Sequence, residues 1–82
     1  MRPERVSREE ADYALDRFGF APRAISRGHV IYMSGSMNTP LHLYFGNGDI
    51  DWDDFADALT ANSINEEEFC QLLFEFRAKR KI

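Results

Sequence analysis

The chain has few of the residues that stabilise secreted domains or anchor proteins in membranes. It has one cysteine, Cys70, among its 82 residues, which excludes an internal disulfide and favours a reducing compartment. No apolar run approaches the roughly 20 residues that span a bilayer, and the opening stretch MRPERVSREE has no apolar leader. We therefore expect a cytoplasmic protein that does not associate with membranes, folded as one domain over residues 1–82.

Charge is absent from one stretch and of a single sign in another. Residues 30–45 carry no formal charge, whereas residues 46–75 carry nine acidic side chains and neither Lys nor Arg. Basic residues are confined to the six arginines of residues 1–29 and to residues 76–82. Because a nucleic-acid binder normally needs a basic face, such a face has to come from one of these two segments.

A first helix is predicted over residues 7–18. Ser7 and Glu10 have the spacing of a capping box, in which each side chain accepts a hydrogen bond from the other residue's backbone N–H. Gly19 stands where a left-handed C-terminal cap would fall. The apolar positions that follow recur at helical spacing: Ala11, Ala14, Leu15 and Phe18.

Three strands are predicted next. Residues 20–26 include Pro22, which has no N–H to donate and so favours an edge strand. Residues 29–34 are β-branched and aromatic, and residues 34–38 are typical of a turn. In residues 41–45 polarity alternates, with His42 and Tyr44 opposite the apolar side chains. The three strands are expected to form an antiparallel meander.

Two further helices complete the predicted order. Asp51 is expected to cap a helix that ends at residues 62–63, and Asn65 to cap the last one. Acidic residues occupy the first turn of each helix, where the helix dipole favours them. Their apolar stripes are Trp52, Phe55, Ala56 and Leu59 in the former, and Phe69, Leu72, Leu73 and Phe76 in the latter.

Two motifs that bear on chemistry are set aside. Residues 49–53 read DIDWD, the spacing that opens an EF-hand loop, but Asp54 and Thr60 occupy the places that require glycine and a carboxylate. No metal site is therefore predicted. Cys70 lies on an apolar helix with nothing nearby in sequence to activate it, which favours an inert buried thiol.

His29 leaves two interpretations open. It follows a glycine and leads into a strand, where most histidines satisfy a local hydrogen bond and do no chemistry. The less common alternative is that His29 is the titrating group of an active site. No acid lies near it in the sequence to orient the ring.

The order of these motifs resembles the HicA toxin family, small ribonucleases of toxin–antitoxin pairs with a double-stranded-RNA-binding-domain-like fold. The matching residues run over about 5–73: Gly19-Phe20, then Arg27-Gly28-His29-Val30-Ile31-Tyr32, then Leu43, Phe45, Gly48, Phe55 and Leu59, and finally Ser63-Ile64-Asn65-Glu66-Glu67-Glu68-Phe69.

The resemblance implies an α+β fold in the order α-β-β-β-α with an additional C-terminal helix. It also implies an mRNA-cleaving endoribonuclease that needs no cofactor and no metal. His29 matches the family's catalytic histidine, which transfers a proton when the 2′-hydroxyl attacks the adjacent phosphate. Arg23, Arg27 and Gly28 would then hold RNA, and a cognate antitoxin would neutralise the protein.

The second helix supports an alternative function. The family has lysine and arginine there, whereas this chain has Asp51, Asp53, Asp54 and Asp57 around Trp52. These five residues would suit a non-catalytic module on the same scaffold that binds a basic protein partner or mimics a nucleic acid. A homodimer joined through an edge of the uncharged strand region is a further expectation.

Overall fold

The computed structural model describes residues 2–35 and 40–80, and over these residues the chain is a mixed α+β protein, as predicted. The predicted turn at residues 34–38 lies mostly outside them. The elements within the described residues are β1 (Arg5–Ser7), α1 (Arg8–Arg17), β2 (Phe20–Ser26), β3 (His29–Ser34), β4 (Leu41–Tyr44), β5 (Asp49–Asp51), α2 (Trp52–Ala61) and α3 (Glu66–Arg80).

The larger sheet is the predicted antiparallel meander, with strand order β2-β3-β4. Strand β2 lies at one edge, where Pro22 costs no ladder hydrogen bond. In the pairing of β3 with β4, His29 lies opposite Tyr44 and Ile31 opposite His42. This register decides which side chains meet on each face of the sheet.

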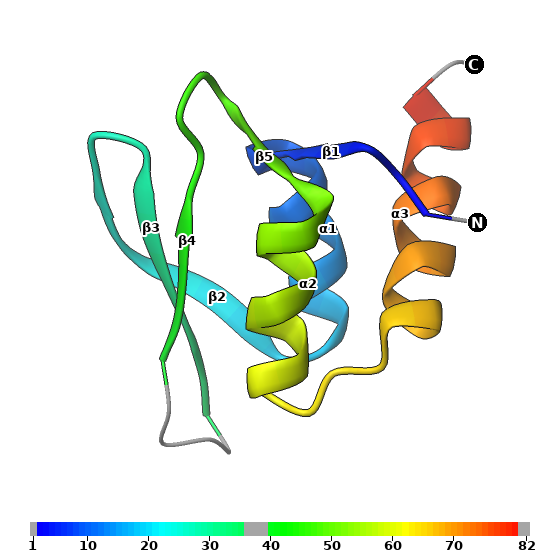
Figure 1. Cartoon of the computed structure of the whole chain (residues 1–82). Helices are drawn as coiled ribbons and strands as arrows, with labels where there is room; N and C mark the ends of the chain where they lie inside the picture. Colours follow the sequence, from blue (N-terminus) through cyan, green and yellow to red (C-terminus); the bar gives the residue numbers. More distant parts are fainter. Residues whose placement is uncertain (1, 36–39, 81–82) are drawn as a thin grey trace.

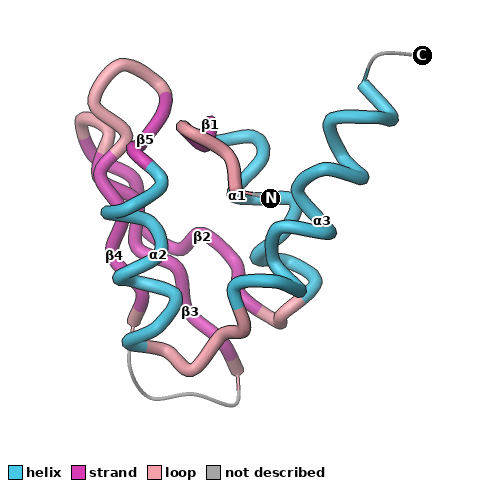
Figure 2. The backbone as a smooth tube through the Cα atoms, turned by 45° about the vertical axis from the view of Figure 1, so that its right-hand side comes forward, coloured by secondary structure: helices cyan, strands magenta, loops and turns pink. Residues whose placement is uncertain are grey.

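One face of this sheet packs against the helices, and no other element of residues 2–35 and 40–80 covers the opposite face. Val30, Tyr32, Leu41 and Leu43 are buried beneath α1 and α2, and the helices lie to one side of the strands (Figure 1). Helix α3 lies against α1 on the side away from the sheet (Figure 1 and Figure 2). The alternate positions of β3 and β4 therefore point away from the core.

A second sheet of two short strands was not predicted. β1 pairs antiparallel with β5, and Val6 and Ile50 face each other as buried residues. The Arg5 guanidinium donates to Asp49 at 2.7 Å and also pairs with Asp51. This sheet ties the N-terminal residues to the segment that leads into α2.

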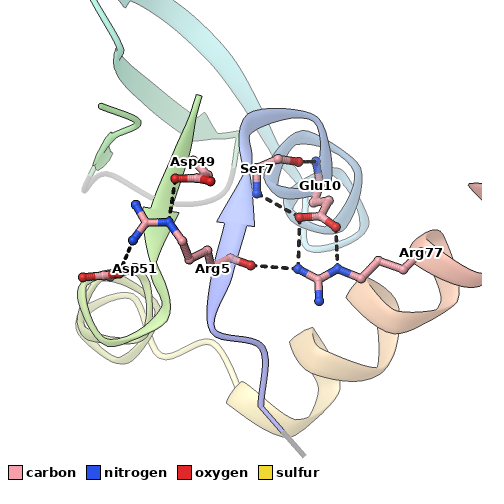
Figure 3. Close-up of polar contacts among 6 residues, drawn as sticks. All are labelled: Arg5, Ser7, Glu10, Asp49, Asp51 and Arg77. Atoms are coloured by element: carbon pink, nitrogen blue, oxygen red, sulfur yellow. Dashed lines mark hydrogen bonds and ion pairs between the residues drawn. The ribbon is translucent and has the colours of Figure 1, made fainter. Parts of the chain in front are cut away.

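A buried carboxylate joins α1, α3 and β1 (Figure 3). Glu10 accepts from the Ser7 backbone N–H at 2.8 Å and from Arg77 Nε at 2.5 Å. Arg77 also donates to the backbone carbonyl of Arg5 at 2.7 Å. Burial by itself would raise the pKa of the Glu10 carboxyl, but these hydrogen bonds and the Arg77 charge outweigh it and lower that pKa.

The helix caps agree with the sequence at two of three positions. Ser7 and Glu10 form the predicted capping box, and the Asn65 side chain accepts from the Glu68 backbone N–H at 3.0 Å. The prediction that the Asp51 side chain caps α2 is wrong, since it makes no cap hydrogen bond and pairs with Arg5 instead. Among residues 2–35 and 40–80, no helix combines the length and apolar character needed to cross a bilayer.

Candidate functional site

The strongest candidate site is a cluster of rings on the uncovered face of the sheet. His29 Nε2 lies 3.0 Å from His42 Nδ1, within hydrogen-bond distance. The His29 ring also stacks on Tyr44, with ring centroids 4.2 Å apart and planes inclined by 11°. Tyr44 is 64% exposed, so the cluster is open to solvent. We call His29, His42 and Tyr44 the ring cluster.

Strand geometry explains why these three residues meet. His29 and Tyr44 are directly opposite in the β3–β4 ladder, and His42 lies two residues before Tyr44 on the same face. Opposite and diagonal neighbours on one face of an antiparallel pair lie within reach of aromatic side chains. His29 therefore contacts both His42 and Tyr44 through the strand pairing alone, without a loop to position it.

The contact between the two imidazoles sets what the cluster can do. A neutral imidazole has one N–H donor and one acceptor nitrogen, so in a neutral pair one ring donates and the other accepts. Two rings in direct contact cannot stand on opposite sides of one phosphate. The contact instead allows His42 to fix the orientation and tautomer of the His29 ring, an arrangement suited to proton transfer by one ring of the pair.

The turn before His29 accounts for Arg27 and Gly28. Both residues have positive φ, 49° and 83°, which is typical of the tight hairpin turn between β2 and β3. A Cβ on Gly28 would lie 2.7 Å from the backbone oxygen of Phe45, and the Phe45 N–H donates to the Gly28 carbonyl at 2.7 Å. These contacts require glycine at position 28 for structural reasons alone, and Arg27 is exposed in the turn two residues before His29.

Arg23 lies elsewhere on the same sheet. It is exposed on β2, where the register with β3 shifts between Pro22 and Ala24. The bulge places Arg23 outside the ladder pairs that connect β2 to β3. Of the predicted RNA-binding residues, Arg27 and Gly28 adjoin the ring cluster in sequence, and Arg23 stands apart from it.

The residues of the alternative site do not form one exposed surface. Trp52 is 5% exposed, and its ring packs near Phe55 and Phe69 in the core. The hypothesis that Trp52 anchors a partner on the surface is therefore wrong. The Asp51 carboxylate forms an ion pair with Arg5. The remaining acids of α2 are exposed, and we call them the acidic face: Asp53, Asp54 and Asp57.

Neither Cys70 nor a cluster of metal ligands provides a second candidate site among the described residues. Burial raises the pKa of the Cys70 thiol, which agrees with an inert cysteine. Among the described residues, no three His, Cys, Asp or Glu side chains gather closely enough to hold a metal ion.

Sequence reasoning found His29 but missed His42 and Tyr44 as its partners. The alternation of residues 41–45 already placed those two on one face. The missing information was the register of β4 against β3. Comparison with models of known protein families, with curated proteins and with solved structures gave no match for this chain.

Proposed function

We propose that the protein is a HicA-like endoribonuclease toxin that acts in the cytoplasm and cleaves mRNA at the ring cluster. The observation that carries this proposal is the pairing of His29 with His42 on an open sheet face, 3.0 Å apart. The resemblance of residues 27–32 to the family's histidine motif supports the same assignment.

The ring cluster supplies the groups that RNA cleavage needs. When His29 Nε2–H donates to His42 Nδ1, His29 Nδ1 holds the lone pair that accepts the proton of the ribose 2′-hydroxyl. The 2′-oxygen then attacks phosphorus and the 5′-oxygen leaves, taking a proton back from the imidazolium. The products are a 2′,3′-cyclic phosphate and a 5′-hydroxyl end. His42 is the positioning residue in this scheme.

Tyr44 and Arg27 would bind the substrate. An exposed tyrosine ring on a sheet face is a platform on which an unpaired base can stack. An arginine at the tip of the adjoining turn can pair with phosphate. Single-stranded RNA suits this arrangement better than a duplex, because a paired base cannot reach the ring.

The acidic face is less unfavourable to RNA than its sequence suggests. Helix α2 packs on the core side of the sheet, while His29 and His42 lie on the opposite side. The charges of the two faces therefore lie on opposite sides of the sheet, and salt in the surrounding solvent screens the effect of the acidic face on RNA bound at the other side. The same carboxylates offer a docking surface for the basic side chains of an antitoxin.

The test is RNA integrity in cells after induced expression of the wild type, His29→Ala and Met33→Ala. Met33 is exposed on the same face as His29 and outside the ring cluster, so its variant is a matched control. We expect the wild type and Met33→Ala to degrade message, and His29→Ala to be slower by roughly 10²–10⁴-fold. Intact RNA with the wild type, or equal degradation by folded His29→Ala, would overturn the proposal.

A further inference from the structure

We propose that His29 and His42 also form a two-imidazole binding site for a borderline divalent metal ion, of which Zn²⁺ is the probe. The nitrogens of the pair that face each other are 3.0 Å apart. With metal–nitrogen bonds of about 2.0–2.1 Å, this separation corresponds to a nitrogen–metal–nitrogen angle of about 91–97°. A tetrahedral angle at the metal needs a nitrogen–nitrogen separation of about 3.3 Å. Chelation therefore requires the pair to open by a few tenths of an ångström and the two rings, whose centroids are 5.1 Å apart, to turn until both lone pairs point at the metal.

The tautomers of the two imidazole rings allow a metal ion to replace the hydrogen bond between them. Each neutral imidazole has one N–H, and the proton between the rings belongs to one of them. If that ring takes its other tautomer, the proton moves to an outer nitrogen. Both facing nitrogens, His29 Nε2 and His42 Nδ1, then present lone pairs to the same point. The metal ion replaces the shared hydrogen bond without removing a proton from either ring.

The fold prepares the pair for chelation. Both histidines lie on adjacent strands held by a backbone ladder, and the His29 ring is stacked against Tyr44. Little side-chain freedom remains to be lost when the second nitrogen binds, which is the entropic advantage of a preorganised site. The open face leaves room for water at the remaining coordination positions.

The donors determine which ions bind. Imidazole nitrogen suits Zn²⁺, Cu²⁺ and Ni²⁺, whereas Mg²⁺ and Ca²⁺ require oxygen ligands. The acidic face is on the other side of the sheet and contributes no carboxylate to this pair. We therefore expect selective binding of one borderline ion per chain, with exchangeable water in the open positions.

The experiment is calorimetric titration of Zn²⁺ into the full, chelator-treated chain. The wild type, Met33→Ala and Cys70→Ser are expected to bind equally, because the first substitution leaves the pair intact and the second removes the thiol as a competing ligand. His29→Ala and His42→Ala are each expected to bind at least roughly tenfold more weakly. Thermal unfolding of every variant verifies that the fold is retained.

Two outcomes would overturn the inference. One is equal Zn²⁺ affinity in the wild type and both histidine variants, and the other is loss of binding in Cys70→Ser alone. A consequence that rests on the proposed function is that bound Zn²⁺ occupies His29 and suppresses RNA cleavage. Zn²⁺ binding without nuclease activity would overturn the proposed function alone. Cleavage without Zn²⁺ binding at the pair would overturn the metal site alone.

Discussion

At the scale of single residues, Glu10 is a buried charged side chain that connects α1 to α3. It is 6% exposed and accepts from Arg77, which reaches across from α3 at 2.5 Å (Figure 3). We expect Glu10→Gln to lower the free energy of unfolding by roughly 1–3 kcal/mol, since it replaces charge-assisted hydrogen bonds with neutral ones. Urea unfolding at pH 7 measures the loss, and Glu9→Gln is a control at an exposed neighbour.

The same carboxylate should make stability depend on pH. Its pKa is lowered in the folded protein, so its contribution is complete above the ordinary carboxyl pKa of about 4.3. That contribution is lost as the pH falls through the folded value, because the unfolded chain then binds the proton more readily. Glu10→Gln should therefore differ from the wild type less at pH 3 than at pH 7. A difference that is constant with pH would contradict this account of the Glu10 contacts.

At the scale of secondary structure, the elements that the sequence predicts are those with local signals. The capping box of Ser7 and Glu10 lies within four residues and identifies the start of α1. β1 and β5 have three residues each, and they pair Val6 with Ile50 across most of the chain. A three-residue strand has no periodicity of its own, so only tertiary contact defines it.

The candidate site was predictable to the same extent. His29 stands out by its residue type and its preceding glycine, and the alternation of residues 41–45 places His42 and Tyr44 together. The contact between these residues depends on the register of β3 against β4. Register depends on turn geometry and on which face is buried, and neither is determined by residues 29–45 alone.

Helix α2 leads to a prediction about Trp52. The indole ring is 5% exposed and lies 6.0 Å from the Phe55 ring, centroid to centroid. We expect the tryptophan fluorescence of the native protein to be blue-shifted and only weakly quenched by acrylamide. On unfolding in urea the emission should shift to the red and the quenching should become stronger. Acrylamide is the proper quencher because it is neutral, whereas iodide would be repelled by Asp53 and Asp54 whatever the burial of Trp52. Emission at the wavelength of the unfolded chain would show that Trp52 is exposed on the acidic side.

At the scale of the whole molecule, the fold separates two surfaces of different chemistry. The ring cluster lies on the open face of the larger sheet, Arg27 is exposed in the turn that leads into β3, and the acidic face lies on a helix that covers the other side of the sheet. A single protein can therefore bring an anion to one surface and a cationic partner to the other. The carboxylates of the acidic face would oppose RNA binding if they lay next to His29. They lie instead on a helix on the other side of the sheet.

This separation predicts different outcomes for two sets of substitutions. Asn at positions 53, 54 and 57 removes three of the negative charges behind the formal net charge of −4. We nevertheless expect RNA binding to change by less than about threefold at physiological salt, because α2 packs against the face of the sheet opposite the ring cluster and salt screens charges across the solvent. Arg27→Ala should weaken RNA binding and reduce its salt slope by about one. Fluorescence anisotropy of a labelled single-stranded RNA at several salt concentrations compares both with the wild type.

The triple substitution also tests whether the acidic face is a docking surface that is electrostatically independent of RNA binding. If the acidic face is a docking surface for a basic partner, the Asn variant loses that partner while RNA cleavage by His29 persists. If RNA binding instead rises sharply in the Asn variant, the carboxylates act on phosphate directly, and the two surfaces are not electrostatically independent. In that case the acidic helix limits RNA binding at the proposed nuclease site, and neutralising that helix with a basic protein would activate rather than inhibit cleavage.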